Sequence, residues 1–146
     1  MQSSAGVQEI AHVIQLAVAP VFLLTGVASL LGVLTSRLGR VIDRARLLEG
    51  HLDSTTGEFK SLMSSDLKML GRRARYINRA ISLCTIAALL VCLLIASLFV
   101  SAFYATDISR FVAVLFVLAM VCLTLGLLFF LREVRLATAS LRIGPS

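Results

Sequence analysis

The stretch Ala80–Ala105, AISLCTIAALLVCLLIASLFVSAFYA, contains no charged residue over its 26 positions. Two similar stretches flank it: VIQLAVAPVFLLTGVASLLGVLTS at Val13–Ser36 and FVAVLFVLAMVCLTLGLLFFL at Phe111–Leu131. A helix of about 20 apolar residues spans the ~30 Å hydrocarbon core of a bilayer. Helices of a soluble bundle need a polar face, which these stretches lack. The sequence therefore predicts an all-α polytopic membrane protein with three transmembrane helices.

The composition fits one membrane domain over residues 1–146. The chain is 58% hydrophobic and 15% charged, whereas soluble domains are roughly 45–50% apolar. Its three cysteines, Cys84, Cys92 and Cys122, all fall within the apolar stretches, where reduced thiols pack like small hydrophobic side chains. The two histidines, His12 and His51, match no metal-ligand spacing and are expected on opposite sides of the membrane. We therefore expect no metal and no cofactor.

The distribution of lysine and arginine predicts the orientation in the membrane. Residues 1–12 carry none, residues 37–79 carry ten, the connector 106–110 carries one, and the tail 132–146 carries three. Short loops rich in positive charge stay on the cytoplasmic side. We therefore expect the amino terminus outside, and both the long basic segment and the carboxyl-terminal tail in the cytoplasm.

The basic segment shows two apolar seams with heptad-like spacing, each continuous with a neighbouring span. The seam that follows the first span consists of Leu34, Leu38, Val41, Ala45, Leu48 and Leu52. The seam that leads into the second span consists of Met63, Leu67, Leu70, Ala74, Ile77 and Ile81. Gly50 is a candidate helix stop, and Thr55 with Glu58 is a candidate capping box for the next helix. The pattern predicts that the first two spans extend as a cytoplasmic antiparallel hairpin, a coiled coil within one chain or between chains.

The first span carries a stripe of small, weakly polar residues, which we call the small-residue stripe: Thr25, Ser29, Gly32 and Ser36. Such a surface is typical of close helix–helix contacts in lipid. The alternative is that it lines a pore in a homo-oligomer. Pro20 lies in the same span and either kinks its helix or marks its first turn.

The hairpin also holds a predicted charge network: Arg37, Arg40, Asp43, Arg44, Arg46, Arg72, Arg73, Arg75 and Arg79. Helical spacing favours ion pairs along the first arm, and the hairpin should bring Asp43 close to Arg72 or Arg73. Arginines near the inner leaflet would attract anionic lipid head groups. No nucleic-acid recognition motif is present, so we do not expect nucleic acid as a partner.

The second and third spans should pack as a hairpin, because the connector between them is only about five residues long. Thr106 or Asp107 is suited to cap the third helix. We expect the final residues to form a short frayed tail.

Two motifs of the basic segment resemble a bacterial family of small membrane proteins classed as a domain of unknown function. The first, R-x-x-R-x-x-D-R-x-R-x-L, falls on Arg37, Arg40, Asp43, Arg44, Arg46 and Leu48. The second, L-x-R-R-x-R-x-I-x-x-A/S-I, falls on Leu70, Arg72, Arg73, Arg75, Ile77, Ala80 and Ile81. The resemblance implies a location in the bacterial inner membrane and implies no activity.

The leading functional hypothesis from the sequence is a homo-oligomeric pore. The small-residue stripe would line it, and Arg37 and Arg40 would form an inner mouth that favours anions. The alternative is an accessory or scaffold subunit without transport, whose basic hairpin binds a cytoplasmic protein or anionic lipid. An enzyme is the least expected class, because no nucleophile or acid–base set converges in the sequence.

Overall fold

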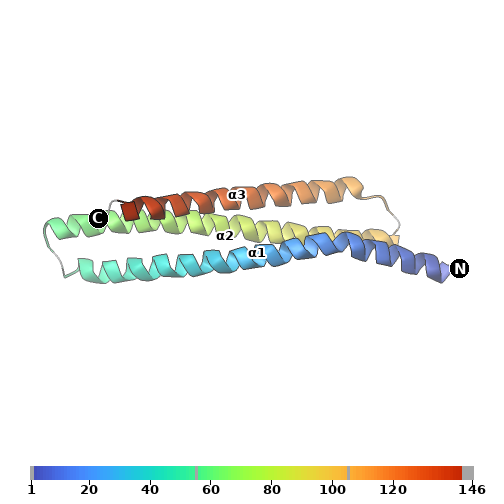
Figure 1. Cartoon of the computed structure of the whole chain (residues 1–146), viewed down its shortest axis with the longest axis horizontal. Helices are drawn as coiled ribbons and strands as arrows, with labels where there is room; N and C mark the ends of the chain where they lie inside the picture. The colour runs from blue at the N-terminus through green and yellow to red at the C-terminus, as the bar shows by residue number, and fades with distance from the viewer. Residues whose placement is uncertain (1, 55, 105, 143–146) are drawn as a thin grey trace. The chain divides into compact units, whose positions relative to one another are not determined.

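The computed structural model describes residues 2–54, 56–104 and 106–142, and this part of the chain is all-helical. Helix α1 comprises Gln2–Leu52, α2 comprises Glu58–Tyr104 and α3 comprises Ser109–Arg142 (Figure 1). Each helix is long and apolar enough to cross a bilayer. The all-α prediction and the three candidate spans are therefore confirmed, and they indicate a membrane protein.

The chain forms two compact units, and each unit contains a part of all three helices. Unit 1 comprises Met1–Leu30 and Leu83–Thr124, and unit 2 comprises Leu31–Ser82 and Leu125–Ser146. Thirteen of the 14 lysines and arginines belong to unit 2, together with six of the eight acidic residues. The chain's excess positive charge is therefore a property of unit 2.

Unit 1 buries both small and larger apolar side chains. Its buried residues include Ala17, Ala87 and Ala119, together with Leu94 and Leu115. Helix α1 continues without interruption through Pro20, which is itself buried. Pro20 therefore does not start the helix, and Figure 1 shows α1 changing direction in its blue segment.

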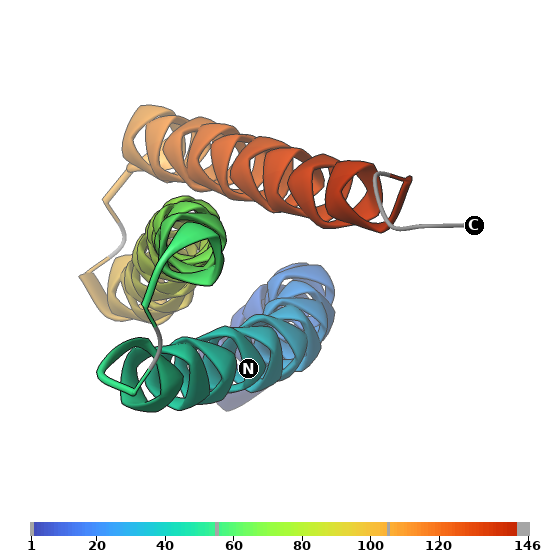
Figure 2. The same cartoon turned by 90° about the vertical axis from the view of Figure 1, so that its left-hand side faces the viewer.

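Unit 2 is packed along the two predicted seams. All twelve seam residues are buried or half-buried within the single chain, and Leu34 and Ile77 have no exposed area. Figure 2 shows the facing segments of α1 and α2 side by side at the turn that joins them. The periodicity of the sequence thus identified the packed face of each helix correctly.

The turn between α1 and α2 is built around glycine. Helix α1 ends at Leu52, two residues beyond the candidate stop Gly50, and the amide of Ser54 donates to the carbonyl of His51. Gly57 has a φ of 91°, a conformation that side chains with a Cβ rarely adopt. Its carbonyl accepts a hydrogen bond from the amide of Lys60 at 3.1 Å. The predicted capping box depends on Thr55, which lies outside the described residues.

Helix α3 begins after a capping residue and continues beyond the predicted span. The amide of Ser109 donates to the carboxylate of Asp107 at 3.2 Å, which confirms Asp107 as a capping residue. The predicted span ends at Leu131, whereas α3 remains helical to Arg142; residues 143–146, at the end of the expected frayed tail, lie outside the described residues. The physical reason is that packing continues: Glu133 is fully buried and Leu136 is half-buried.

Candidate anion-binding site

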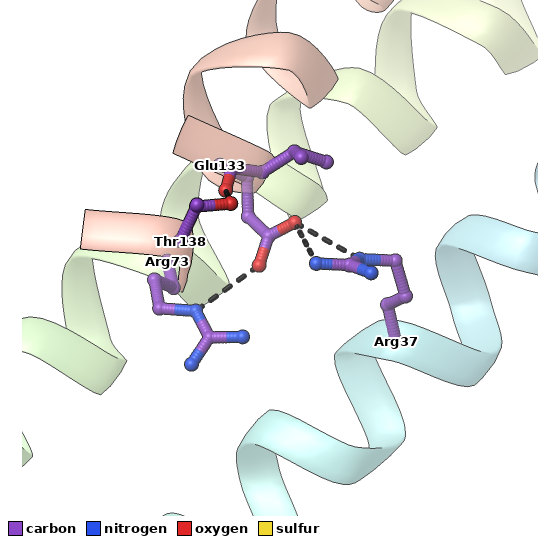
Figure 3. Close-up of polar contacts among 5 residues, drawn as sticks. Arg37, Arg73, Glu133 and Thr138 are labelled. Carbon is purple, nitrogen blue, oxygen red and sulfur yellow. Dashed lines mark hydrogen bonds and ion pairs between the residues drawn. The ribbon is translucent and has the colours of Figure 1, made fainter. Parts of the chain in front are cut away.

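A buried carboxylate joins the three helices of unit 2. The side chain of Glu133 in α3 has no exposed area. Its Oε2 accepts hydrogen bonds from Arg37 of α1, from Nη2 at 2.7 Å and from Nε at 2.9 Å. Its Oε1 accepts a hydrogen bond from Nε of Arg73 in α2 at 3.0 Å (Figure 3). Both carboxylate oxygens are therefore engaged by arginines from different helices.

The packing of unit 2 explains why these side chains meet. Arg37 follows the buried Leu34 by three positions, and Arg73 follows the buried Leu70 by three positions. Each arginine therefore lies at the border of a packed seam, with 32% and 18% of its side chain exposed, respectively. A carboxylate buried without such partners would cost several kcal/mol. The two arginines make the burial of Glu133 possible.

Two arginines lie over the ring faces of aromatic residues at the end of the third apolar stretch. The guanidinium of Arg37 lies 5.5 Å from the ring centroid of Phe130, and that of Arg79 lies 5.9 Å from Phe129. The rings of Tyr76 and Phe129 are 6.2 Å apart and tilted by 33°. Both cation–ring distances are within the range at which the ring quadrupole attracts a cation. Arg37 is thus oriented by a carboxylate and by a ring.

Four arginines line one small hollow beside this carboxylate, which we call the arginine pocket. It has a volume of about 170 Å³. Its lining residues are Arg37, Arg40, Val41, Arg44, Leu70 and Arg73. Four guanidinium groups with one neighbouring carboxylate, Glu133, leave a clear excess of positive charge. The chemistry of this pocket is therefore that of an anion receptor.

Residues 17–143 match the family described as "Protein of unknown function (DUF2721)". The chain belongs to this family. No curated protein and no solved structure matches the chain significantly. The family description assigns no activity, so the function of this member has to be argued from its geometry.

The structure distributes the predicted charge network of this family member over several places. Arg37, Arg40, Arg44 and Arg73 come together at the arginine pocket, and Arg79 lies on Phe129. Arg46 lines a different hollow with Asp43, and Arg72 and Arg75 line a third hollow with Lys68. The network is therefore centred on one pocket, with its remaining members on separate surfaces.

The structure shows no ion pair between Asp43 and Arg72 or Arg73 within the described residues. Arg73 pairs with Glu133, and among the residues that the structure describes Asp43 forms no ion pair. Asp43 is exposed. An ion pair of exposed side chains gains little over hydration, so charge spacing alone does not enforce such a contact.

The small-residue stripe lies on the surface of the chain. Thr25, Ser29, Gly32 and Ser36 are all exposed. The hydroxyl of Thr25 donates to the carbonyl of Val21 at 3.2 Å, and that of Ser29 donates to the carbonyl of Thr25 at 3.1 Å. Helix α1 itself therefore satisfies these two hydroxyl donors, without a partner helix. The role of the stripe, as a helix interface or as a pore lining, stays a prediction.

Sequence reasoning missed Glu133, although a signal for it was present. The buried positions Leu115, Ala119, Gly126 and Glu133 of α3 are separated by four, seven and seven residues. This seam has the same period as the seams of α1 and α2. A carboxylate at a seam position must find cationic partners, but the sequence analysis identified no seam in the third apolar stretch. Within the described residues, no group of three histidine, cysteine, aspartate or glutamate side chains is placed to hold a metal.

Proposed function

We propose that the protein is a membrane protein that acts as an accessory or scaffold subunit and does not transport. Its basic hairpin, residues 37–79, would bind an anionic lipid or an acidic protein. The observation that carries this proposal is the arginine pocket, a hollow of about 170 Å³ with four arginines among its six lining residues. Glu133 neutralises only part of this charge. An anionic ligand would supply the remaining counter-charge.

The proposal includes an orientation and a membrane. Because 13 of the 14 basic residues belong to unit 2, the positive-inside rule favours the hairpin and the carboxyl terminus in the cytoplasm. The amino terminus would then lie outside. The family resemblance found in the sequence favours the bacterial inner membrane. At its cytoplasmic leaflet, each arginine near the surface gains about 1 kcal/mol from anionic lipids.

The proposal does not include an enzymatic role. The one buried carboxylate among the described residues, Glu133, accepts three hydrogen bonds from Arg37 and Arg73. A carboxylate held in this way by two guanidinium groups from different helices is suited to hold the helices together.

A pull-down in mild detergent tests the scaffold proposal. The test variant replaces by glutamine the five hairpin arginines that contact neither Glu133 nor an aromatic ring: Arg40, Arg44, Arg46, Arg72 and Arg75. The matched control carries Arg132→Gln and Arg135→Gln, which neutralise exposed arginines outside the hairpin. We expect a stoichiometric partner or retained anionic lipid with the wild type and the control, and its loss with the hairpin variant. If the wild type purifies alone and free of lipid, the proposal fails.

A pore is the second candidate, and the exposed small-residue stripe of α1 favours it. A homo-oligomer would cover this stripe or enclose it around a channel. A Cβ added at Gly32 meets nothing within 4 Å, so a larger side chain there leaves the single chain intact. Gly26 offers a matched control, because its Cβ is equally free and it lies about 100° around the helix from Thr25.

Ion flux through liposomes distinguishes the two candidates. For a pore, wild-type protein should conduct, Gly32→Leu should reduce the flux, and Gly26→Leu should leave it unchanged. An absence of flux above that of empty vesicles would exclude the pore and leave the scaffold proposal in place.

A further inference from the structure

The arginine pocket keeps most of its hydrogen-bond donors available. A guanidinium group carries five N–H donors. Arg73 donates one of them, on Nε, to Glu133, and Figure 3 shows its two terminal nitrogens directed away from that carboxylate. Within the described part of the chain, Arg40 and Arg44 form no ion pair. The pocket therefore presents several donors from two helices around one hollow.

The size of the pocket limits what it can take. Pockets for drug-sized ligands measure about 300–1,000 Å³. The arginine pocket, at about 170 Å³, is smaller than that and has room for a small polyatomic anion. The two apolar residues of its lining, Val41 and Leu70, are 3% and 5% exposed. The hollow therefore combines four arginines with a buried apolar part.

Two of the four arginines are held in place before any ligand arrives. Arg37 is oriented by two hydrogen bonds to Glu133 and by the ring of Phe130, and Arg73 by one hydrogen bond to Glu133. Ordering a free side chain costs about 0.5–1.5 kcal/mol when a ligand binds. Glu133 reduces this cost for two side chains. We regard it as a positioning residue of the pocket.

We propose that the arginine pocket binds a phosphate monoester group. This inference rests on the proposed function and names the anion that the basic hairpin recognises. A phosphate monoester carries a charge of about −1.5 to −2 near neutral pH and presents three acceptor oxygens. A carboxylate or a phosphodiester carries one charge and two acceptor oxygens. The excess of guanidinium groups over carboxylates in the pocket matches the larger charge, and planar guanidinium groups suit bidentate contacts to phosphate oxygens.

The same group can come from a lipid or from a soluble molecule. Phosphatidic acid presents a phosphate monoester at the membrane surface, whereas phosphatidylglycerol presents only a phosphodiester. A soluble phosphate ester would approach from the aqueous side. The experiment therefore has one arm for the phosphate group itself and one arm for its source.

The first arm measures binding of inorganic phosphate to the full-length protein in neutral detergent at physiological ionic strength, by calorimetry. The pocket variant carries Arg40→Gln and Arg44→Gln, which leaves the contacts of Glu133 in place. The control variant carries Arg46→Gln and Arg72→Gln, which removes the same charge from the hairpin but outside the pocket. We expect the pocket variant to bind about 30-fold more weakly. The control should change by less than about threefold, because Arg46 and Arg72 do not line the pocket and salt screens charges that make no direct contact with the anion.

The second arm measures lipid binding in nanodiscs of phosphatidylcholine that contain either phosphatidic acid or phosphatidylglycerol, by native mass spectrometry. Preference for phosphatidic acid, lost in the pocket variant and kept in the control, identifies a lipid as the source. Binding of inorganic phosphate without a preference between the lipids identifies a soluble phosphate ester. Both outcomes support the inference.

Other outcomes overturn the inference. If both variants weaken phosphate binding equally, the anion recognises general positive charge and not the pocket, while the scaffold proposal stands. If the wild type binds neither phosphate nor phosphatidic acid, the pocket is not a phosphate site, and the pull-down alone decides the proposed function. Unfolding in SDS, followed by circular dichroism, shows whether each variant is folded. For a misfolded pocket variant, the single substitution Arg44→Gln provides the same comparison.

Discussion

Replacing Glu133 by glutamine should destabilise the protein strongly, although the two side chains have nearly the same size. The substitution removes the charge that pairs with Arg37 and Arg73 and places an amide donor against one of the two guanidinium groups. Three charge-assisted hydrogen bonds, of 2.7 to 3.0 Å, are lost or weakened. Removing one partner of a buried ion pair typically costs about 3–5 kcal/mol.

The structure places the expected value at the lower end of that range. The side chains of Arg37 and Arg73 are 32% and 18% exposed, so each released guanidinium regains part of its hydration. We therefore expect a loss of about 3 kcal/mol in the free energy of unfolding. The measurement is an SDS titration of the purified protein in mixed micelles, followed by far-UV circular dichroism. Glu49→Gln is the matched control, because Glu49 is exposed and should change stability by less than about 0.5 kcal/mol.

A double-mutant cycle isolates the contact from other effects of the substitution. Arg73→Gln alone should destabilise the protein, since it leaves one oxygen of Glu133 without its donor. In the Arg73→Gln background, Glu133→Gln should cost about 1–2 kcal/mol less than in the wild type, because part of the interaction is already gone. Strict additivity of the two substitutions, or a loss below about 0.5 kcal/mol for Glu133→Gln, would refute the view that Glu133 joins the three helices.

Three further predictions concern the helices and their ends. Gly39→Ala should stabilise the protein by about 1 kcal/mol in the SDS titration, because a Cβ at Gly39 meets nothing within 4 Å and alanine favours the helix. A destabilisation would reveal that another surface packs against α1 at Gly39. Ile77→Ala should lower the free energy of unfolding by about 3 kcal/mol, because Ile77 is fully buried. Leu47→Ala should lower it by less than about 0.5 kcal/mol, because Leu47 is 66% exposed. Equal effects of the two substitutions would contradict the packing of unit 2. Hydrogen bonds from the side chain and then the backbone of Ser109 lower the pKa of Asp107, so Ser109→Ala should raise this pKa towards its ordinary value in an NMR titration. The folded-state pKa of Asp107 lies below its unfolded-state pKa. The contribution of Asp107 to stability is therefore present above the unfolded-state pKa and is lost as the pH falls through the folded-state pKa. An unchanged pKa of Asp107 in Ser109→Ala would contradict this role of the Ser109 side chain.

The helices and their packed faces could be predicted from the sequence because both follow from local patterns. Three uncharged stretches are long enough to span a bilayer, and Leu34 and Ile77 lie on seams whose spacing is visible without any structure. The predicted third span ends at Leu131, because Arg132 and Glu133 follow its apolar stretch, whereas α3 continues to Arg142. A charged residue ends a candidate membrane span, but it does not end a helix that continues to pack.

The candidate site could be predicted only in part, because its contacts join residues that are far apart in the sequence. Arg37 and Glu133 are separated by 96 positions, and Arg73 and Glu133 by 60. The motifs of the basic segment named both arginines, yet they indicated no partner on the third helix. Pairing by proximity in the hairpin favoured Asp43, which the structure leaves exposed. Which carboxylate an arginine reaches depends on the rotation of all three helices, and no single segment encodes that rotation.

One charged residue among the buried positions of α3, Glu133, makes the site recognisable. Leu115, Ala119 and Gly126 are apolar or small, as a packed face requires, and Glu133 continues their spacing with a charge. A buried charge is costly unless it is paired, and replacing such a pair by apolar side chains is often neutral or stabilising. Stability alone therefore gives little reason to keep a carboxylate at this position. Orienting Arg37 and Arg73 at the wall of a pocket that holds two further arginines gives such a reason, and it connects the packing of three helices to the binding of an anion.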